Sequence, residues 1–337
     1  MGCRGQPADD ENEGVGMSKE DKPLVTFALF AYNQEGYIRE AVEGALSQDY
    51  PNLEIILSDD CSQDRTYELM QELAARYVGP HVVRLNRNPR NLSIGGHVNA
   101  VNRLARGKLV VAAAGDDISL PGRTSALVDA WLGTGKRAGL LHSVRREFLT
   151  GHGFVRDDAC RCLDALESLE RIVSENAHVS GATEAWDPEL FRLFGDFLDT
   201  TFHEDCALTF RSVLANRPVV YVDQVLVLWR QQTGVTFEAN LNRHGYDSST
   251  RLRELIRLRS ISHQFQADLK LVPNEYIADL TMKRAARADA AIQFELGWPS
   301  PRQFIGLIRS TNLAFTARLT VKKAVNSWRD WRYQWPG

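Results

Sequence analysis

Apolar positions along the first 140 residues follow two alternating spacings, and each spacing predicts a different element. Short runs rich in strand-favouring residues lie at 24–30, 53–58, 81–85 and 108–114. Between the runs, apolar residues recur every three or four positions, as they do on one face of a helix. These helical stretches centre on 38–46, 67–77 and 95–106. Strands that alternate with helices of this length predict a parallel sheet covered by helices on both faces.

The alternation ends near residue 138. Further strands are predicted at 138–143 and 219–230, with a hairpin between them that turns at Gly151–Gly153. Helical patterns cover 162–175, 187–194, 204–216 and most of the chain after residue 240. We therefore expect an α/β fold with a mostly parallel sheet and a helical C-terminal extension. The expected parts are a disordered tail at 1–22, the α/β domain at 23–237 and the helical region at 238–337.

The composition of the 337 residues changes this picture little. Hydrophobic residues make up 44% and charged residues 25%, which is ordinary for a globular chain. A net charge of −3 argues against nucleic acid as a partner. No apolar run reaches about 18 residues, and the acidic first 22 residues lack the apolar core of a signal peptide. The five cysteines form no CxxC pair, so we expect plain thiols in a reduced, cytoplasmic compartment.

Two pairs of adjacent aspartates follow predicted strands. Asp59 and Asp60 end the second strand, and Asp116 and Asp117 come just after the fourth. The carboxyl ends of parallel strands form the edge at which such sheets bind ligands. A single aspartate there commonly caps the next helix, which is the role expected of Asp64. Two pairs at equivalent strand ends instead favour a shared ligand.

Three kinds of ligand site cluster aspartates in this way. Mg²⁺ and Mn²⁺ prefer carboxylate oxygens and take phosphates as further ligands, so the pairs can hold a cation that binds a nucleotide diphosphate. A phosphoryl-accepting receiver domain also needs a lysine at a strand end, where this chain has His142 and Ser143. A dinucleotide dehydrogenase needs G-x-G-x-x-G after the first strand, and "AYNQEGY" does not supply it. The metal and nucleotide site is the interpretation that fits.

Four segments extend this interpretation. They read "VTFALFAYNQEGYIREAVEGALSQDYPNLEIILSDDCSQDRT" at 25–66, "ARGKLVVAAAGDDISLP" at 105–121, "HEDCALTFR" at 203–211 and "WRQQTGVT" at 229–236. In this order and spacing they resemble glycosyltransferase family 2, the GT-A type enzymes that use nucleotide-diphospho-sugars. The resemblance covers roughly 24–237 and implies a GT-A type nucleotide-binding sheet there.

The resemblance implies a nucleotide site at the strand ends. Phe30 and Tyr32 would flank the base, because an aromatic face stacks on a base; the alternative is that both are core aromatics. Asp60 would accept a hydrogen bond from the base or ribose, while Asp59 would buttress its loop. Arg230 would neutralise the diphosphate leaving group. UDP and dTDP donors are the ones expected.

The resemblance also implies a divalent cation, Mn²⁺ or Mg²⁺. Asp117 would be a direct ligand, and Asp116 would contact the ribose or the cation. A bound cation would offset the repulsion between two adjacent carboxylates. Gly115, which precedes them, permits a close approach of the backbone.

Two departures from the family pattern affect the site. Gln232 stands where the family often has a histidine that is the third metal ligand, and an amide oxygen binds these cations weakly. The family's Ala-Arg-Asn segment before the fourth strand reads His97-Val98-Asn99 here. The basic contact to the phosphates is therefore absent or moved to Arg90 or Arg103.

The "HED" segment would supply catalysis. Asp205 would be the general base that deprotonates the acceptor hydroxyl, with Glu204 as the alternative. Adjacent helical residues point about 100° apart, so one of the two faces the sugar. Both would otherwise be first-turn acids that favour the helix dipole. Gly181 would give room to the donor sugar, and Trp186 would pack on an acceptor sugar or lie buried.

The end of the chain is basic and rich in tryptophan. After residue 300 one acid, Asp330, opposes seven basic residues: Arg302, Arg309, Arg318, Lys322, Lys323, Arg329 and Arg332. Basic residues interleaved with tryptophan suit an anionic membrane surface. A helical lid on the main domain, or a homodimer contact, is the alternative.

Together these features predict an inverting glycosyltransferase. It would move a sugar from a nucleotide-diphospho-sugar to a hydroxyl of a glycan or lipid-linked acceptor, in surface polysaccharide or lipopolysaccharide biosynthesis at the inner face of the membrane. A sugar-1-phosphate nucleotidyltransferase would want a glycine-rich, basic loop after the first strand, which is missing here. A nucleotide-sugar-binding protein without turnover is the other alternative.

Overall fold

The computed structural model describes residues 22–151, 153–158, 166–231, 233 and 248–297, and seven positions between 303 and 320. Its strands are β1 Val25–Ala31, β2 Leu53–Asp59, β3 Val82–Arg87, β4 Val110–Ala114, β5 Ile118–Ser119, β6 Leu140–Leu149, β7 Gly153–Asp158, β8 Ala185–Trp186 and β9 Val219–Arg230. Its helices are α1 Ile38–Leu46, α2 Thr66–Arg76, α3 Ser93–Leu104, α4 Arg123–Gly133, α5 Leu169–Glu175, α6 Glu189–Phe194, α7 Glu204–Leu214, α9 Ser248–Leu269 and α10 Glu275–Leu296, with a 3₁₀ turn, η2, at Gly181–Thr183.

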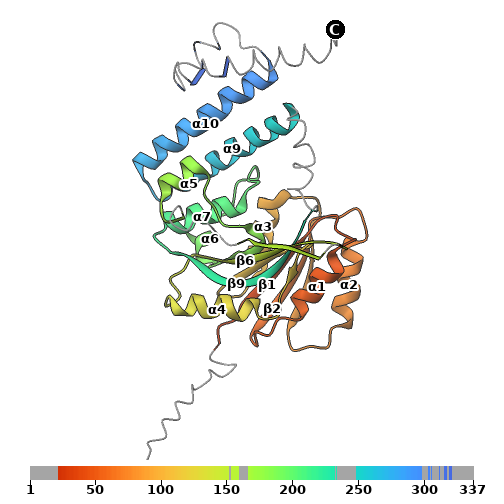
Figure 1. Ribbon diagram of the computed structural model, residues 1–337. Coiled ribbons are helices and arrows are strands. Elements are labelled where there is room, and N and C mark those ends of the chain that lie inside the picture. The colour runs from red at the N-terminus through yellow and green to blue at the C-terminus, as the bar shows by residue number, and fades with distance from the viewer. Residues whose placement is uncertain are drawn as a thin grey trace, which may run out of the picture.

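The strands form one curved sheet in the order β3-β2-β1-β4-β8-β6-β9-β5, and β7 pairs with β6 (Figure 1). β1 lies between β2 and β4 and is parallel to both, so the chain reverses its winding direction there. This is the switch point at which open α/β sheets bind ligands. The α/β class and the mostly parallel sheet are confirmed. The short antiparallel strands β5 and β8 are additions that the sequence pattern did not indicate.

The predicted hairpin is the β6–β7 pair. Gly151 and Gly153 both have positive φ, 79° and 83°, which only glycine adopts readily. β6 continues to Leu149 rather than ending at 143, because it pairs on one side with β9 over most of its length. The hairpin therefore extends the sheet beyond its parallel part.

Helices cover both faces of the sheet. Alternate residues of β1 face opposite sides: Phe27 and Leu29 pack with α1, α2 and α4, while Ala28 packs with α3, α6 and α7. All three side chains are fully buried. The two cores place the loops at the carboxyl ends of β1, β2 and β4 along one edge.

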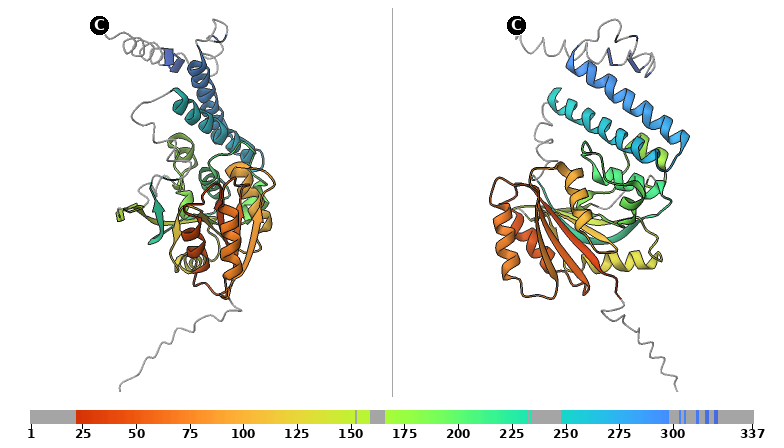
Figure 2. Two further views of the ribbon diagram at one scale, coloured as in Figure 1. Left: turned by 90° about the vertical axis from the view of Figure 1, so that its right-hand side faces the viewer. Right: turned by 180° about the vertical axis from the view of Figure 1, so that it is seen from behind.

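The C-terminal helices stack on the face that carries α5 and α7 (Figures 1 and 2). α9 is fixed to α7 by stacked rings of Phe210 and Phe265, 4.0 Å between centroids, and by a buried ion pair between Arg211 and Asp268. The helical prediction holds for 248–296, and these helices pack on the main domain. Within the described residues, none of the helices is both long and apolar enough to cross a membrane. The tail predictions, for 1–21 and for the basic, tryptophan-rich end, lie outside the described residues.

Candidate active site

The loop after β1 lies at the switch point and presents one aromatic ring. Tyr32 is 43% exposed, whereas Phe30 is half-buried and packs edge-on against His97, 5.0 Å between centroids. Tyr32 is thus the aromatic available to a base, and Phe30 is mainly a core contact. A Cβ on Gly115 would lie 2.4 Å from Gln34 Oε1, so only glycine lets the β4 loop meet the β1 loop this closely.

The first aspartate pair shapes the neighbouring loops. Asp59 is fully buried and accepts hydrogen bonds from the backbone N–H (3.0 Å) and the hydroxyl of Ser62, which is the buttress role predicted for it. Asp60 Oδ1 accepts from Asn88 Nδ2 at 2.8 Å and from the Leu92 N–H at 2.9 Å. Asp60 therefore anchors the loop between β3 and α3, a role that the sequence did not indicate.

The second pair lies between β4 and β5. Asp117 is 5% exposed, and its Oδ1 accepts from the Arg230 N–H at 2.9 Å; Asp116 is the more exposed of the two. Burial raises the pKa of Asp117 well above its usual value, and the charge of Asp116 raises it further. Burial also raises the pKa of Asp116. The protein thus supplies too little positive charge for two carboxylates, which fits a site for a divalent cation. Gln232, the expected third ligand, lies outside the described residues.

Arg230 is occupied by protein partners. Only 2% of it is exposed. Its Nε donates to the Asp116 carbonyl at 2.9 Å and its Nη1 to Thr150 Oγ1 at 2.7 Å. Its Nη2 lies 3.2 Å from Glu40, and its guanidinium lies over the Phe148 ring. These contacts make Arg230 a residue that positions the acidic loop, rather than a free charge for a leaving group.

Arg145 of β6 is a partly exposed cation near the loop that carries Asp116 and Asp117. The sequence analysis predicted no role for it. It lies close enough to Asp117 to lower the pKa of that carboxyl, against the larger effect of burial. Its Nη1 donates to Ser180 Oγ at 2.9 Å, it pairs with Asp158, and its guanidinium stacks on Trp229 at 4.0 Å. No signal marked it, because 144–155 appeared as an ordinary hairpin.

The catalytic pair predicted in "HED" occupies the first two positions of α7. Burial, and then the charge of Asp205, raises the pKa of Glu204 to about 8, so Glu204 holds a proton at neutral pH. Asp205 Oδ1 accepts from the Cys206 N–H at 2.7 Å, while Oδ2 lies 3.6 Å from His178 Nε2. A Cβ on Gly181 would lie 2.9 Å from Glu204 Oε1. Gly181 therefore makes room for the glutamate, and its expected role toward the donor sugar stays a prediction.

A buried arginine links the two acidic sites. Arg123 is fully buried, and its guanidinium donates to main-chain carbonyls of the β4 and η2 segments. Burial lowers its pKa to about 10, while Asp117 and Glu184 both oppose that shift. Burial, followed by the charges of Glu204 and Asp205, raises the pKa of Glu184 well above its usual value. Neither Arg123 nor Glu184 was predicted, since nothing local to them indicates chemistry.

Trp186 is not available to an acceptor sugar. It is fully buried in β8, between β4 and β6, and its Nε1 lies 3.4 Å from Asn102 Oδ1. Of the two alternatives predicted for Trp186, packing on an acceptor sugar or lying buried, the structure shows the second. Phe202, just before the "HED" segment, is 43% exposed and is an aromatic that a sugar can reach.

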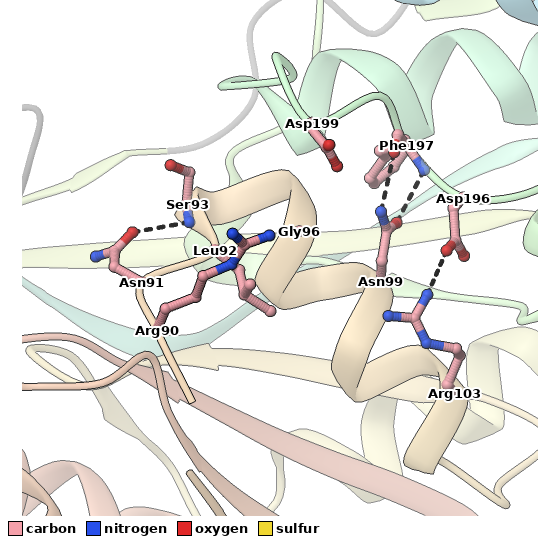
Figure 3. A pocket seen from close by; sticks show the side chains of 10 residues that line it. All are labelled: Arg90, Asn91, Leu92, Ser93, Gly96, Asn99, Arg103, Asp196, Phe197 and Asp199. Carbon is pink, nitrogen blue, oxygen red and sulfur yellow. Dashed lines mark hydrogen bonds and ion pairs between the residues drawn. The ribbon is translucent and has the colours of Figure 1, made fainter. Parts of the chain in front are cut away.

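The arginine of the family's Ala-Arg-Asn segment, which reads His97-Val98-Asn99 here, is only partly replaced by Arg90 and Arg103. Burial lowers the pKa of His97 to about 4, so this histidine is neutral, and it lies 2.6 Å from Ser58 Oγ. Arg103 pairs with Asp196 (Figure 3). Arg90 and Arg103 line a pocket of about 430 Å³ on the outer side of the loop that Asp60 anchors. Its lining is Arg90, Asn91, Leu92, Ser93, Gly96, Asn99, Arg103, Asp196, Phe197 and Asp199.

A second group with metal-binding atoms is less suited to a cation. His178, Asp205 and Cys206 each bring one ligand atom within 4.8 Å of the others. Burial raises the pKa of the Cys206 thiol well above its usual value, and metals bind the thiolate. Arg284 stands beside it, with Nη2 2.6 Å from Asn176 Oδ1. Asp116 and Asp117 are therefore the better candidates for a metal site.

Comparison with known proteins agrees with this geometry. The family model described as glycosyl transferase family 2 matches residues 26–166. EpsE of Bacillus subtilis (strain 168) is 35% identical over 101 residues, which are 30% of this chain and 36% of EpsE. The succinoglycan biosynthesis protein ExoO of Rhizobium meliloti (strain 1021) is 36% identical over 107 residues, which are 32% of this chain and 29% of ExoO. The chain thus spans about a third of these relatives.

Two solved structures share the fold. Residues 1–349 of S. aureus TarS, in complex with UDP-GlcNAc, superpose with a TM-score of 0.53 at 17% identity, over 90% of this chain and 92% of that one. The mannosyltransferase PcManGT of Pyrobaculum calidifontis, in complex with GDP-Man and Mn²⁺, gives 0.54 at 17% identity, over 92% and 90%. The fold is therefore of the GT-A type, as expected. The segment 26–166 is thus similar to glycosyltransferase family 2, in agreement with the motifs of the sequence.

Proposed function

We propose that this protein transfers a sugar from a nucleotide-diphosphate donor to a hydroxyl acceptor, in one displacement that inverts the anomeric carbon. The observation that carries the proposal is the presence of two acidic pairs in different surroundings, Asp116–Asp117 among arginines and Glu204–Asp205 beside histidines. Burial raises the pKa of Asp116 and Asp117 although Arg123, Arg145 and Arg230 act against that shift, and burial raises the pKa of Glu204, beside Asp205, to about 8. Such a transfer needs a cation at the diphosphate and a base at the acceptor.

The donor half of the site lies at the ends of β1, β2 and β4. Tyr32 offers its exposed ring to the base. Asp116 and Asp117 would hold Mn²⁺ or Mg²⁺, which would supply Lewis-acid stabilisation to the departing diphosphate. Arg145, 21% exposed in its side chain, is the nearby arginine placed to add charge to that leaving group. PcManGT, bound to GDP-Man and Mn²⁺, supports a cation in this fold.

The acceptor half lies at the start of α7. Glu204 keeps its proton at neutral pH, so Asp205 is the carboxylate that can take one. Asp205 Oδ2 lies 3.6 Å from His178 Nε2, and the Asp205 side chain remains 16% exposed. Asp205 would accept the hydroxyl proton as the acceptor oxygen attacks the anomeric carbon. Phe202 beside it offers a face to an acceptor sugar.

The acceptor class follows from the relatives. ExoO is named for succinoglycan biosynthesis, and TarS holds UDP-GlcNAc. We infer that the acceptor is a hydroxyl of a growing surface glycan or of its lipid-linked precursor. Since the solved neighbours hold a uridine and a guanosine donor, both bases belong in the test, beside dTDP donors.

The test is a donor panel. UDP-GlcNAc, other UDP-sugars, dTDP-sugars and GDP-Man are incubated with Mn²⁺, and binding and nucleotide release are measured, with EDTA and Asp205→Asn as controls. The expected result is metal-dependent binding of one donor, with slow hydrolysis that Asp205→Asn removes. Release of pyrophosphate from a nucleoside triphosphate and a sugar 1-phosphate would show a nucleotidyltransferase. Tight binding without turnover, with or without acceptor glycans, would show a binding protein.

A further inference from the structure

One carboxylate oxygen of Asp205, Oδ2, faces a histidine with a fixed orientation. His178 Nδ1 lies 2.7 Å from the carbonyl of Asn176. A carbonyl only accepts, so Nδ1 carries the proton and Nε2 is the nitrogen that gains or loses one. Nε2 lies 3.6 Å from Asp205 Oδ2, a gap that a small rotation or one bridging water closes.

The support for this orientation comes from the C-terminal helices. Asn176 ends α5 in the left-handed conformation, with φ of 57°. Its Oδ1 accepts from Arg284 Nη2 at 2.6 Å, and Arg284 Nη1 donates to the Val173 carbonyl at 2.7 Å. Arg284 belongs to α10. A side chain more than 100 residues away in sequence thus fixes the loop that aims His178 at Asp205.

We propose that His178 is the second member of a proton relay, and that Arg284 positions it through Asn176; this rests on the glycosyl transfer proposed above. The acceptor O–H bond breaks as its oxygen bonds to the anomeric carbon, and the bond from that carbon to the diphosphate breaks with its electron pair leaving on the diphosphate. The proton moves to Asp205 Oδ2 and then to His178 Nε2. From His178, whose side chain is 32% exposed, it leaves to water.

The surroundings of Asp205 explain why a path that carries the proton from this carboxylate to solvent is useful. Glu184 and Glu204 lie close to Asp205, and burial raises the pKa of both, so neither readily takes over the role of an ionised base. A base that kept the proton would be inactive in the next turnover. The relay restores the carboxylate beside a histidine that can exchange with solvent.

The other groups near His178 do not fill the same role. His203 Nδ1 lies 4.0 Å from Asp205 Oδ1, but that oxygen is occupied by the Cys206 N–H. The pKa of His203 is lowered, chiefly by burial, with the charges of Arg257, His178 and Arg284 acting in the same direction and that of Asp205 against it. The Cys206 thiol stays protonated.

The test is the pH dependence of nucleotide release, with water as acceptor and UDP-GlcNAc or GDP-Man plus Mn²⁺ as the probe. In the wild type the rate should rise with pH, because a protonated His178 cannot take the proton from Asp205. His178→Gln should lower kcat by about 10- to 100-fold and remove that rise, with donor affinity and thermal unfolding unchanged. His203→Gln should keep the rise. His263→Gln, on α9 and outside the proposed relay, should match the wild type.

Two further variants separate a relay from a structural role. His178→Gly should regain rate when free imidazole is added, because a small base can take the proton from Asp205. Arg284→Met should lower kcat more than it changes donor affinity and should keep the pH rise. A His178→Gln enzyme with the wild-type pH profile, or a His178→Gly enzyme that imidazole leaves unchanged, would overturn the relay. If no donor is turned over by the wild type, the proposed function fails instead.

Discussion

The same kind of dipeptide, two adjacent acids, serves two different purposes in this molecule. Asp116–Asp117 follow strand β4 and Glu204–Asp205 begin helix α7, and each pair contains a carboxyl whose pKa is raised by burial. Around the first pair stand Arg230, Arg123 and Arg145, which hold the loop. Around the second stand another acid, Glu184, and the histidines that face Asp205.

The difference lies in what each environment accepts. The first pair lies in a rigid frame of backbone and guanidinium contacts, which suits a cation with fixed ligand geometry. The second pair has another acid and two histidines as neighbours, which suits the transfer of a proton. Neighbours, rather than the acids themselves, therefore decide between metal binding and proton transfer.

The substitution expected to have the largest effect is Asp205→Asn, which tests the proton-transfer role of the Glu204–Asp205 pair. It keeps the shape of the side chain and removes the proton acceptor. General-base catalysis contributes about 10²- to 10⁴-fold, so sugar transfer should fall by that much, with donor affinity nearly unchanged. Initial rates and donor titration would check this. Glu204→Gln, which only fixes the proton already present, should cost far less. If Glu204→Gln is the inactive variant, the two acids have exchanged roles.

Asp117→Asn tests the other pair. Removing one carboxylate charge should weaken Mn²⁺ binding and reduce Mn²⁺-dependent donor affinity by about 10- to 100-fold, because a ligand or its close support is lost. Calorimetric titration of donor with and without Mn²⁺ would measure the effect. Asp64→Asn, in the neighbouring β2–α2 loop, is the matched control and should retain metal dependence. Metal-dependent binding at wild-type strength in a folded Asp117→Asn protein would remove the cation site from this pair.

The smallest expected effect is on stability. The pKa of Glu204 is raised from an ordinary value of 4.5 to about 8. Between these pH values the unfolded chain loses a proton that the folded protein keeps, so stability falls as pH rises through this window and then levels off. Glu204→Gln should remove that slope and be more stable than wild type by about 1–3 kcal/mol at pH 8.5, yet equal near pH 4.5.

Denaturant unfolding at both pH values would measure this difference. Glu175→Gln, at an exposed glutamate on α5, is the control and should leave the slope intact. Equal slopes in wild type and Glu204→Gln would mean that Glu204 is ionised in the folded protein, and its contrast with Asp116–Asp117 would vanish.

The sequence alone determined the elements and the edge at which the acids gather. Strands β1, β2 and β4 and helices α1 and α2 were predicted to within about two residues, because their apolar spacing is local and their burial on the two faces follows it. The positions of Asp60, Asp117 and Asp205 followed from the same pattern, together with the family resemblance.

Only the tertiary structure decided what each side chain there can do. Trp186 is buried because the two-residue strand β8 pairs with β4 and β6 in the middle of the sheet. A strand this short has no periodic apolar pattern by which it could be predicted. Arg145 and His178 reach the acids from other elements of the fold, and Arg284 of α10 supports His178 through Asn176. The proton on Glu204 depends on burial and on neighbouring charge, and both exist only after distant segments have packed together. The spacing of apolar residues can be read from the sequence, whereas the charge state of an acidic side chain depends on the residues that surround it in the folded protein.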